Sequence, residues 1–562
     1  MPPLDIRDLP GFSPLIKDYV HRFARLAPFY AVDPHAPDTF RTLAGRCDRR
    51  TFPRQELRSM LRARNQAWGA PDVVLRRIDD LCRKDGLAVF TGQQTGLFGG
   101  PLYTLYKAMT AIVVATRLEA DLGRPVVPVF WLASEDHDIA EADHVVVADQ
   151  SGTPVEIRHT RWGSPGFFPA QLRLGPAIQD TLAQLWSVLP ETEFTAEWQR
   201  ALADAYAPER TLADAFARWM LHLLGEAGLV LTDAADPALK HLAAPLFTRE
   251  LEMAPRTSEL ILAASQELRA LGYPAQIEAR PEGVNMFWIR NGRRPLIRTA
   301  DAFRLRDSGE SVSPDSLLAC CRDAPEQFSP NVALRPIVQD AIFPNIAYIA
   351  GPGELAYFAQ LKNVYAALEV PMPAILPRAS LTILDARMPR LLERFRLRLS
   401  DLTAEPEQLA SKVLRSQLPP DIEATLVAAR VQIEEIFGRV REQVAAVDPT
   451  LSATAGQTGG HLKGHLDQLE RKVVQALKRR EADTRQQLQR LRQGLMPGGK
   501  PQERVYPAIP YLAKYGPVLL SVLTRAITGP GWTHDLLPMG GEATADHAFG
   551  MDGAVTTRRS DA

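Results

Sequence analysis

Two clusters of polar residues near positions 90 and 135 carry the side-chain types that ligand binding and catalysis need. The first reads TGQQTGLFGG and contains four glycines in ten residues. Glycine lets backbone N–H groups approach a ligand closely, and the dipole at a helix start favours an anion. We therefore predict that this cluster holds a nucleotide or an anionic substrate group. The residues concerned are Thr91, Gly92, Gln93, Gln94, Gly96, Gly99 and Gly100.

The alternative for this first cluster is a tight turn with a structural role. It matches neither the GxGxxG pattern of dinucleotide-binding folds nor a phosphate-binding loop, because no Gly-Lys-Ser/Thr follows it. Lys107 lies in the helix-length segment that comes next and is a further binding candidate. A solvated charge is the alternative for a lysine in a helix.

The second cluster, Glu135, Asp136, His137 and Asp138, places three carboxylates and an imidazole in four consecutive residues. Such a set can hold an ammonium group, coordinate a metal ion or act as a general base. His137 is the best candidate for the base, because imidazole titrates near neutral pH. His144 is the nearest additional metal ligand, and a metal site needs more than this, so we predict no protein-bound metal. A solvated loop is the alternative.

Further candidates lie in four later segments of the chain. Arg335 has the planar guanidinium that pairs with a carboxylate or phosphate in a bidentate manner, and Asn331 lies just before it. A charged turn is the alternative for the segment after the last long helix. The later binding candidates are Asn331, Arg335, Gly351, Gly353, Arg378, Ser380, Lys500, Gln502, Glu503, Arg504 and Tyr515.

The elements that position these residues read as β-strands that alternate with α-helices. A strand at 86–94, a helix at 102–122 and a strand at 128–133 form one βαβ unit, and Gly123-Arg124-Pro125 ends its helix. A similar unit has a strand at 345–350, a helix at 354–368 and a short strand at 374–376. This alternation predicts an α/β fold with a Rossmann-like, doubly wound parallel sheet. Ligands are expected at the carboxyl ends of its strands.

The sheet strands are far apart in sequence, so the segments between them must be insertions. Asn291-Gly292, between two apolar runs, predicts a β-hairpin within the second insertion. The predicted domains are a core of 1–138, 211–257 and 331–385, connecting insertions at 139–210 and 258–330, a coiled-coil hairpin at 386–497, a returning segment at 498–539 and a disordered tail at 540–562.

Residues 386–497 are rich in charged residues and show apolar residues at alternating spacings of four and three. This heptad pattern predicts two long helices that pack as an antiparallel coiled-coil hairpin. Asp448-Pro449 and the glycine-rich stretch 456–460 are expected to separate the two helices. Because a two-helix hairpin leaves an apolar stripe uncovered, we predict a homodimer.

The amino-acid composition indicates which kinds of molecule the protein binds. The 562 residues include 65 Lys and Arg and 66 Asp and Glu, so no overall basic field favours nucleic acid or a membrane surface. The four cysteines show no CxxC spacing, which indicates neither a zinc site nor a disulfide framework. Without a signal segment or an apolar run of eighteen residues, the sequence predicts a cytoplasmic protein that acts on small molecules.

Six motifs in a fixed order resemble the bacillithiol-biosynthesis cysteine-adding enzymes. They span about residues 85–516 of the chain. They are TGQQTGLFGGPLYTLYKA (91–108), PVFWLASEDHDIAE (128–141), SPNVALRPIVQD (329–340), GPGELAYFAQLK (351–362), PRAS (377–380) and GGKPQER (498–504). Ser134 stands where that family often has glycine, Ile139 where an aromatic residue is common, and Gly498-Gly499 where Asn-Gly is usual. None of these departures removes a candidate ligand.

The resemblance implies a ligase that joins the carboxyl group of L-cysteine to the glucosamine amine of glucosaminyl malate. It also implies a Rossmann-type core with two connecting insertions and a coiled coil that dimerises. Amide formation in water is uphill, so we expect activation by ATP, with ADP as a further nucleotide ligand and Mg²⁺ bound with the nucleotide. Two alternatives stay open, namely a metal-dependent hydrolase that uses the acidic cluster and a coiled-coil scaffold protein.

Overall fold

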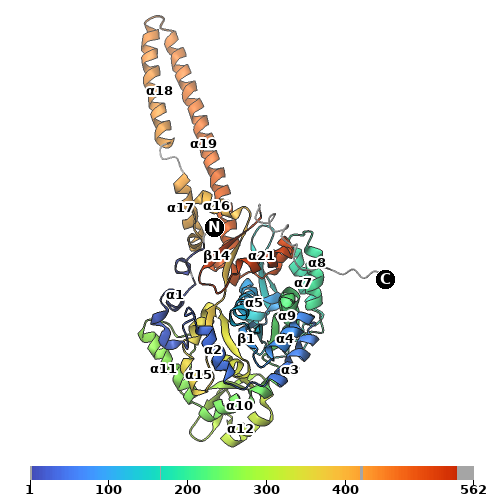
Figure 1. The fold of residues 1–562 in the computed structure, drawn as a ribbon. Coiled ribbons are helices and arrows are strands. Elements are labelled where there is room, and N and C mark those ends of the chain that lie inside the picture. The colour runs from blue at the N-terminus through green and yellow to red at the C-terminus, as the bar shows by residue number, and fades with distance from the viewer. Residues whose placement is uncertain (1–2, 10, 165, 418–421, 541–562) are drawn as a thin grey trace, which may run out of the picture. The chain divides into compact units, whose positions relative to one another are not determined.

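The computed structural model describes residues 3–9, 11–164, 166–417 and 422–540. The chain forms two compact units, which we call the core unit (Met1–Leu384 with Lys500–Ala562) and the hairpin unit (Asp385–Gly499) (Figure 1). The predicted tail, 540–562, lies outside the described residues except for Gly540. The finer boundaries of the two connecting insertions stay predictions.

The core unit contains a five-stranded sheet in which all neighbouring strands run parallel. Across the sheet, the strands are β12 (Ala374–Pro377), β11 (Asn345–Ala350), β1 (Leu87–Gln94), β2 (Val126–Ala133) and β5 (Val230–Asp233). Numbered along the chain and read from β5, their order is 3-2-1-4-5, which is that of Rossmann-like folds. The predicted Rossmann-like parallel sheet is therefore confirmed.

Helices cover this sheet, and its strands are apolar on both faces. In β1, Leu87 and Val89 belong to one apolar cluster, whereas Ala88 and Phe90 belong to the other, because successive side chains point to opposite faces. The helices that contact the sheet include α2 (Thr39–Asp48), α3 (Arg54–Ala67), α4 (Asp72–Leu81), α5 (Leu102–Leu122) and α14 (Pro352–Phe358). As predicted, α5 ends at Gly123, which adopts a left-handed conformation with φ of 63°.

Between β2 and β5 the chain forms a small hairpin and several helices. These elements are α6 (Ile139–Ala142), β3 (His144–Ala148), β4 (Pro154–Arg158), α7 (Ile178–Val188), α8 (Thr195–Ala205) and α9 (Leu212–Leu224). Between β5 and β11 lie α10 (Pro237–Met253), α11 (Arg256–Ala270), α12 (Pro314–Asp323), α13 (Arg335–Ile342) and an antiparallel sheet. That sheet has the order β10 (Phe328–Pro330), β6 (Gly283–Ile289), β7 (Arg293–Arg298), β8 (Phe303–Leu305) and β9 (Ser311–Val312). Asn291 and Gly292 turn the β6–β7 hairpin with positive φ angles, as their sequence predicts.

The prediction of a single helix at 354–368 is wrong, since the structure has two helices there, α14 (Pro352–Phe358) and α15 (Lys362–Ala367). The buried side chain of Gln360 lies between them. Its Oε1 accepts from the N–H groups of Gln276 and Ile277, each at 2.8 Å, and its Nε2 donates to Ser265 Oγ at 2.7 Å. These hydrogen bonds draw the chain toward the second insertion, so the helix is interrupted there.

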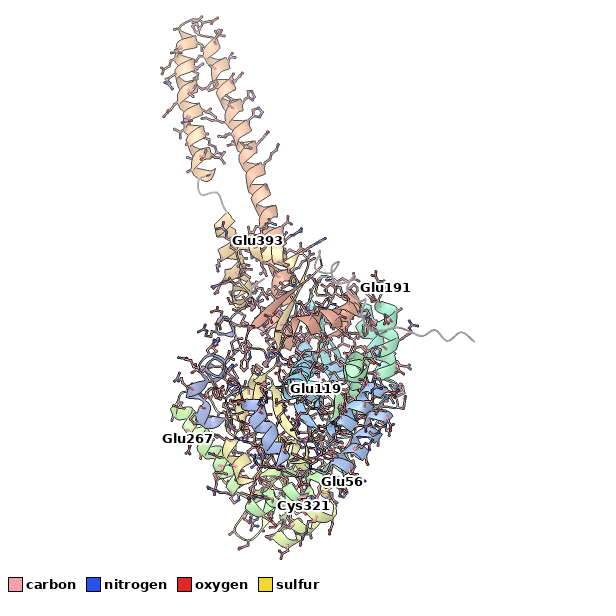
Figure 2. The ribbon with its side chains drawn as sticks, viewed as in Figure 1. Glu56, Glu119, Glu191, Glu267, Cys321 and Glu393 are labelled. Carbon is pink, nitrogen blue, oxygen red and sulfur yellow. The ribbon has the colours of Figure 1, made fainter. Side chains whose placement is uncertain are left out.

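The remaining core elements tie the two ends of the chain to the sheet. They are α1 (Pro14–His21), β13 (Ser380–Asp385), α20 (Ile509–Tyr515), α21 (Val518–Ala526) and β14 (His534–Met539), and β13 pairs with β14. All four cysteines are free thiols, with Cys47 and Cys321 buried, and Figure 2 labels Cys321 on α12.

The hairpin unit consists of α16 (Met388–Phe395), α17 (Pro406–Gln417), α18 (Ile422–Ala445) and α19 (Leu451–Leu495). α18 and α19 pack as a hairpin, which confirms the predicted coiled-coil element (Figure 1). The expected break at 456–460 is wrong, because these residues lie inside α19. A Cβ at Gly459 would lie 3.1 Å from Phe437, so this glycine lets the two helices approach closely.

Candidate functional site

The candidate site lies where the order of strands in the parallel sheet reverses, between β1 and β11. Rossmann-like folds bind ligands outside the carboxyl ends of the strands at this point. The end of β1 contributes Thr91, Gly92, Gln93 and Gln94, and Gly351 follows β11. Thr91 Oγ1 donates to the carbonyl of Ile349 at 2.9 Å and thereby joins the two strands.

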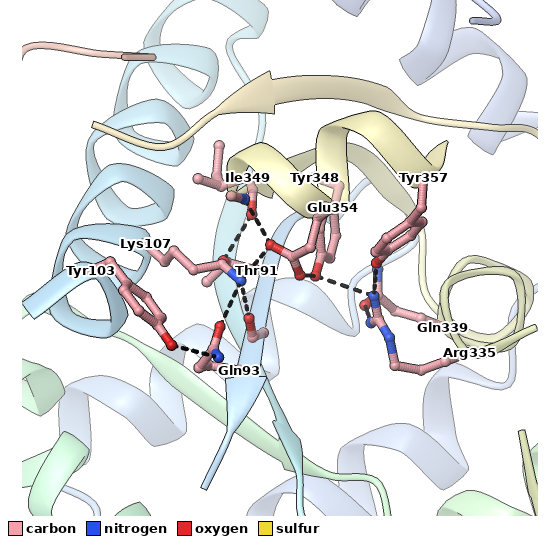
Figure 3. Close-up of polar contacts among 12 residues, drawn as sticks. Thr91, Gln93, Tyr103, Lys107, Arg335, Gln339, Tyr348, Ile349, Glu354 and Tyr357 are labelled. Carbon is pink, nitrogen blue, oxygen red and sulfur yellow. Dashed lines mark hydrogen bonds and ion pairs between the residues drawn. The ribbon is translucent and has the colours of Figure 1, made fainter. Parts of the chain in front are cut away.

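Lys107 of α5 is the central residue of a polar network at the ends of β1 and β11, and 1% of its surface is exposed (Figure 3). Its ammonium group donates to the carbonyl of Gly92, to Gln93 Oε1 at 3.1 Å and to Glu354 Oε2 at 2.5 Å. Glu354 Oε2 also accepts the N–H of Gly351 at 2.7 Å. Burial is the largest influence on the pKa of Glu354 and acts to raise it, but the charge and hydrogen bond of Lys107, the charge of Arg335 and the N–H of Gly351 together hold this pKa below its ordinary value. The ionised form of Glu354 is therefore stabilised, whereas burial lowers the pKa of Lys107 and the Glu354 carboxylate opposes that shift.

Arg335 extends this polar network on the β11 side. Its guanidinium donates to Tyr348 Oη at 3.2 Å, to Tyr357 Oη at 2.9 Å and to Gln339 Oε1 at 3.3 Å (Figure 3). Tyr348 in turn donates to Glu354 Oε1 at 2.7 Å. Arg335 is therefore part of the polar network at this end of the sheet, and its role in ligand binding stays a prediction.

The glycine loop after β1 has several of its N–H groups bonded within the protein. Gly99 donates to Tyr206 Oη at 3.0 Å, Gly100 to the carbonyl of Leu97 at 3.0 Å, and Leu102, at the start of α5, to the carbonyl of Tyr506 at 2.8 Å. The conformation requires glycine, because φ is +90° at Gly99 and +67° at Gly100. A Cβ at Gly96 would lie 3.4 Å from Gly100 Cα.

The acidic cluster divides into a buried part and an exposed part. Glu135 is 5% exposed, and its Oε2 accepts from Lys240 Nζ at 2.6 Å and from Ser329 Oγ at 2.8 Å. Lys240 also donates to the carbonyl of Phe328 at 2.9 Å. Glu135 thus joins the end of β2 to α10 and β10, so it fixes the position of the residues that follow it.

Asp136, His137 and Asp138 face solvent beyond this anchor. The His137 side chain is 65% exposed, and its Nδ1 lies 3.7 Å from a carboxylate oxygen of Asp136. Gln94 Nε2 donates to the carbonyl of Asp138 at 2.9 Å, which brings the two polar clusters together. His137 also lies 6.5 Å, between ring centroids, from Phe287 of β6. An accessible imidazole beside a carboxylate can accept a proton from a bound amine.

Arg378, Ser380, Gln502 and Glu503 form a buried cluster in which the returning segment meets the end of β12 and the start of β13. Arg378 pairs with Glu503 at 2.7 Å, and both side chains are at most 4% exposed. Glu503 also accepts from Ser380 Oγ at 3.0 Å, and Gln502 exchanges two hydrogen bonds with the backbone of Ile383. These four residues therefore attach the returning segment to the core, and Arg378 also lies 5.5 Å from the ring centroid of Tyr103.

The other candidates lie around this edge or away from it. Asn331 Oδ1 accepts from the N–H groups of Ala333 and Leu334 at the start of α13. A Cβ at Gly353 would meet no atom within 4 Å. Lys500 and Arg504 are exposed. Tyr515 ends α20, which packs against α8 rather than against β1 or β11.

Residue types and spacing did not identify four residues that complete the site. Glu354 and Lys240 hold Lys107 and Glu135, and Tyr103 accepts from Gln93 Nε2 at 3.3 Å. Arg293 stacks on Phe287 at 4.2 Å, between its guanidinium carbon and the ring centroid. The one available signal was the glutamate at the third position of a helix that begins directly after Gly351, since a side chain at this position caps the helix.

The described residues lack both a cluster of metal-binding side chains and a membrane-spanning helix. Nowhere in the described ranges do three or more His, Cys, Asp and Glu side chains gather in a group that could hold a metal ion. Nor does any helix among these residues combine the length and apolarity that crossing a membrane requires.

Nearly the whole chain is similar to one protein family. The N-terminal Rossmann-like domain of bacillithiol biosynthesis BshC matches residues 3–379, and the C-terminal coiled-coil domain of the same family matches residues 381–539. Relatives named "Putative cysteine ligase BshC" include one from Salinibacter ruber that is 36% identical over 94% of this chain and 97% of its own. Those from Heliobacterium modesticaldum and Chlorobaculum tepidum are 35% and 33% identical, over 92% of this chain and 96% and 95% of theirs. The chain therefore belongs to the BshC family of bacillithiol biosynthesis.

Proposed function

We propose that this protein is a ligase that joins the carboxyl group of L-cysteine to the amine of glucosaminyl malate, as the last step of bacillithiol biosynthesis. Its family and the names of its full-length relatives support a cysteine ligase. The observation that carries the proposal is the meeting of the β1 and β2 polar clusters at the carboxyl edge of a Rossmann-ordered sheet, through Gln94 and Asp138.

ATP is the proposed source of activation, because a carboxylate and an amine do not condense spontaneously in water. A nucleotide phosphate or an activated carboxyl group needs donors and cations around it. At this edge, Gln93 and Tyr103 offer donors, and Arg504 is exposed. Burial raises the pKa of Tyr103, and the charge of Arg504 opposes this rise. We assign the anionic groups to these side chains rather than to the loop amides already bonded, and Mg²⁺ accompanies the nucleotide.

His137 is the proposed general base. The amine of the acceptor must lose a proton as it attacks the activated carboxyl group. His137 is accessible, its Nδ1 lies 3.7 Å from a carboxylate oxygen of Asp136, and Asp138 follows it in the chain. Glu135, paired with Lys240, positions this segment instead of contacting substrate directly.

A direct assay tests the proposal. The purified protein is incubated with L-cysteine, glucosaminyl malate, ATP and Mg²⁺, and the products are identified by mass spectrometry. We expect the cysteinylated sugar together with either AMP and pyrophosphate or ADP and phosphate, which distinguishes an acyl-adenylate from an acyl-phosphate. Failure to form the amide, combined with an unchanged thiol profile in a deletion strain, would contradict the proposal.

A second copy of the chain is the proposed partner of the hairpin unit. Seven large apolar residues of α18, α19 and the turn between them are exposed by 41–83%. Soluble proteins rarely leave such a set uncovered, so we propose a homodimer through this surface. The residues are Val427, Val431, Ile436, Val447, Leu451, Leu462 and Leu469.

A further inference from the structure

Lys107 uses all of its hydrogen-bonding capacity inside the protein. An ammonium group has three hydrogens, and here they meet the Gly92 carbonyl, Gln93 Oε1 and Glu354 Oε2 (Figure 3). Since the side chain is 1% exposed and has no hydrogen left to donate, it does not contact a reactant itself. Any influence on the chemistry must pass through the residues that it holds.

The contact with Gln93 fixes which end of this side-chain amide faces outward. A carboxamide has an oxygen that accepts and a nitrogen that donates. Because the oxygen accepts from Lys107, a reversed amide would place two donors against each other. The nitrogen is therefore turned away from Lys107, and it donates to Tyr103 Oη at 3.3 Å.

This orientation of Gln93 leaves hydrogen-bond donors side by side next to the first turn of α5. The second N–H of Gln93 and the hydroxyl hydrogen of Tyr103 remain for a ligand, since Tyr103 uses its oxygen to accept from Gln93. Arg378 lies 5.5 Å from the Tyr103 ring centroid, and its own charge is paired with Glu503. A group that binds there must supply oxygens that accept, preferably with negative charge.

We propose that Lys107 is a positioning residue that holds Gln93 so that its amide nitrogen, with Tyr103, binds an anionic oxygen of a reactant. This inference rests on the proposed function, which supplies two sources of such an oxygen, the cysteine carboxylate and a nucleotide phosphoryl group. Glu354 completes the arrangement because it joins Lys107 to the N–H of Gly351 at the start of α14.

Gln93→Glu is the sharpest test. The new carboxylate keeps an oxygen on Lys107, so folding is preserved, but it replaces the outward donor by a charged acceptor. We expect an unchanged or higher melting temperature and an affinity for one reactant that is lower by about tenfold or more. Affinities are measured by calorimetry for L-cysteine and for a non-hydrolysable ATP analogue. Weaker cysteine binding assigns the oxygen to the carboxylate, and weaker analogue binding assigns it to the phosphoryl group.

Lys107→Met tests the link between the two residues. If Lys107 acts through Gln93, a double variant with Gln93→Leu binds no more weakly than the worse single variant. Lys362→Met is the control, because Lys362 is also a helix lysine, at the start of α15, but donates to exposed backbone carbonyls of Ala27 and Pro28. Its affinities should equal those of the wild type.

The outcomes separate this inference from the proposed function. A wild type that forms the amide, with a folded Gln93→Glu variant of unchanged affinity for both reactants, overturns the inference alone. Additive losses of affinity from Lys107→Met and Gln93→Leu also overturn the inference alone, since they indicate that Lys107 only holds the strands together. If Lys107→Met fails to fold, the Gln93→Glu result decides. A wild type that binds neither reactant overturns both.

Discussion

Buried charged residues at the sheet edge occur as pairs between distant parts of the chain. Lys107 pairs with Glu354, Lys240 with Glu135 and Arg378 with Glu503. A buried charge without a partner is strongly destabilising, so each pair requires its two segments to be in place together. This requirement fixes the relative positions of β1, β2, β11 and the returning segment.

Replacing His137 by alanine tests the general base. We expect kcat to fall by about 10²- to 10⁴-fold, with the melting temperature unchanged because the side chain is 65% exposed. Steady-state kinetics of amide formation measures the loss. His241→Ala is the control, since His241 is 59% exposed and lies 3.9 Å from a carboxylate of Glu326 outside the site. Equal activity of the two variants would remove His137 from the mechanism.

His534 predicts a pH-dependent stability. Burial lowers its pKa to about 4 in the folded protein, where its ring lies between Ser380 and Thr382. The unfolded chain, with an ordinary imidazole pKa near 6.5, therefore binds more protons between pH 4 and 6.5. Stability from this group is complete above that window and is lost as the pH falls through it, by roughly 2 kcal/mol between pH 7 and pH 5.

Urea unfolding of the wild type and of His534→Gln at these two pH values measures this contribution. Glu250 and Asp340 act in the opposite direction, because burial raises their pKa values to about 7 and about 6. The comparison with the variant removes their effect. The stability difference between pH 7 and pH 5 should shrink in His534→Gln, and an identical difference in both proteins would exclude a neutral buried imidazole.

At the scale of elements, the strands and the long helices were predictable from sequence. β1 and β2 are continuous apolar runs that end in polar residues, and α5 ends at a glycine, so local signals and fold agree. The break between α14 and α15 was not predictable, because it depends on hydrogen bonds from Gln360 to residues more than 80 positions away. The predicted break near Gly459 failed for a similar reason, because the contact of this glycine with Phe437 outweighs its low helix propensity.

The same division holds for the candidate site. The meeting of the polar ends of β1 and β2 was predictable, since the carboxyl ends of parallel strands lie at the same edge of the sheet. Their partners were not, because Glu354 and Lys240 come from helices whose placement only the tertiary fold decides. Residue types therefore identified Lys107 and Glu135 as candidates, but they did not show which residues these two side chains pair with.

Gly92→Ala tests how closely β1 approaches β2. The added Cβ would lie 2.9 Å from Trp131 Cβ, which is too close, so we expect a loss of about 1–3 kcal/mol in stability. Denaturant unfolding measures the loss. Gly353→Ala is the control, because its Cβ meets no atom within 4 Å and its stability should be equal or slightly higher. Equal stability of Gly92→Ala and the wild type would contradict the close approach.

At the scale of the whole molecule, Val427→Glu with Val431→Glu tests the proposed dimer. Both valines are exposed by about half, so charges there should not disturb the isolated hairpin but should prevent a second copy from covering it. We expect a monomer by analytical ultracentrifugation with an unchanged circular dichroism spectrum. Gln432→Glu, on the exposed surface of the same helix, should keep the association of the wild type. A wild-type monomer at micromolar concentration would refute the dimer.

The pairing of β13 with β14 has a consequence for synthesis on the ribosome. Ser380 and His534, which bond across this pair, are 154 residues apart, and the entire hairpin unit is made between them. At about 5–20 residues per second, β13 waits roughly 10 to 30 seconds for its partner. Throughout that interval the nascent core exposes an unpaired strand edge, the kind of surface that recruits chaperones or pairs wrongly. Completion of the core is thus tied to a segment that is made after the whole hairpin unit.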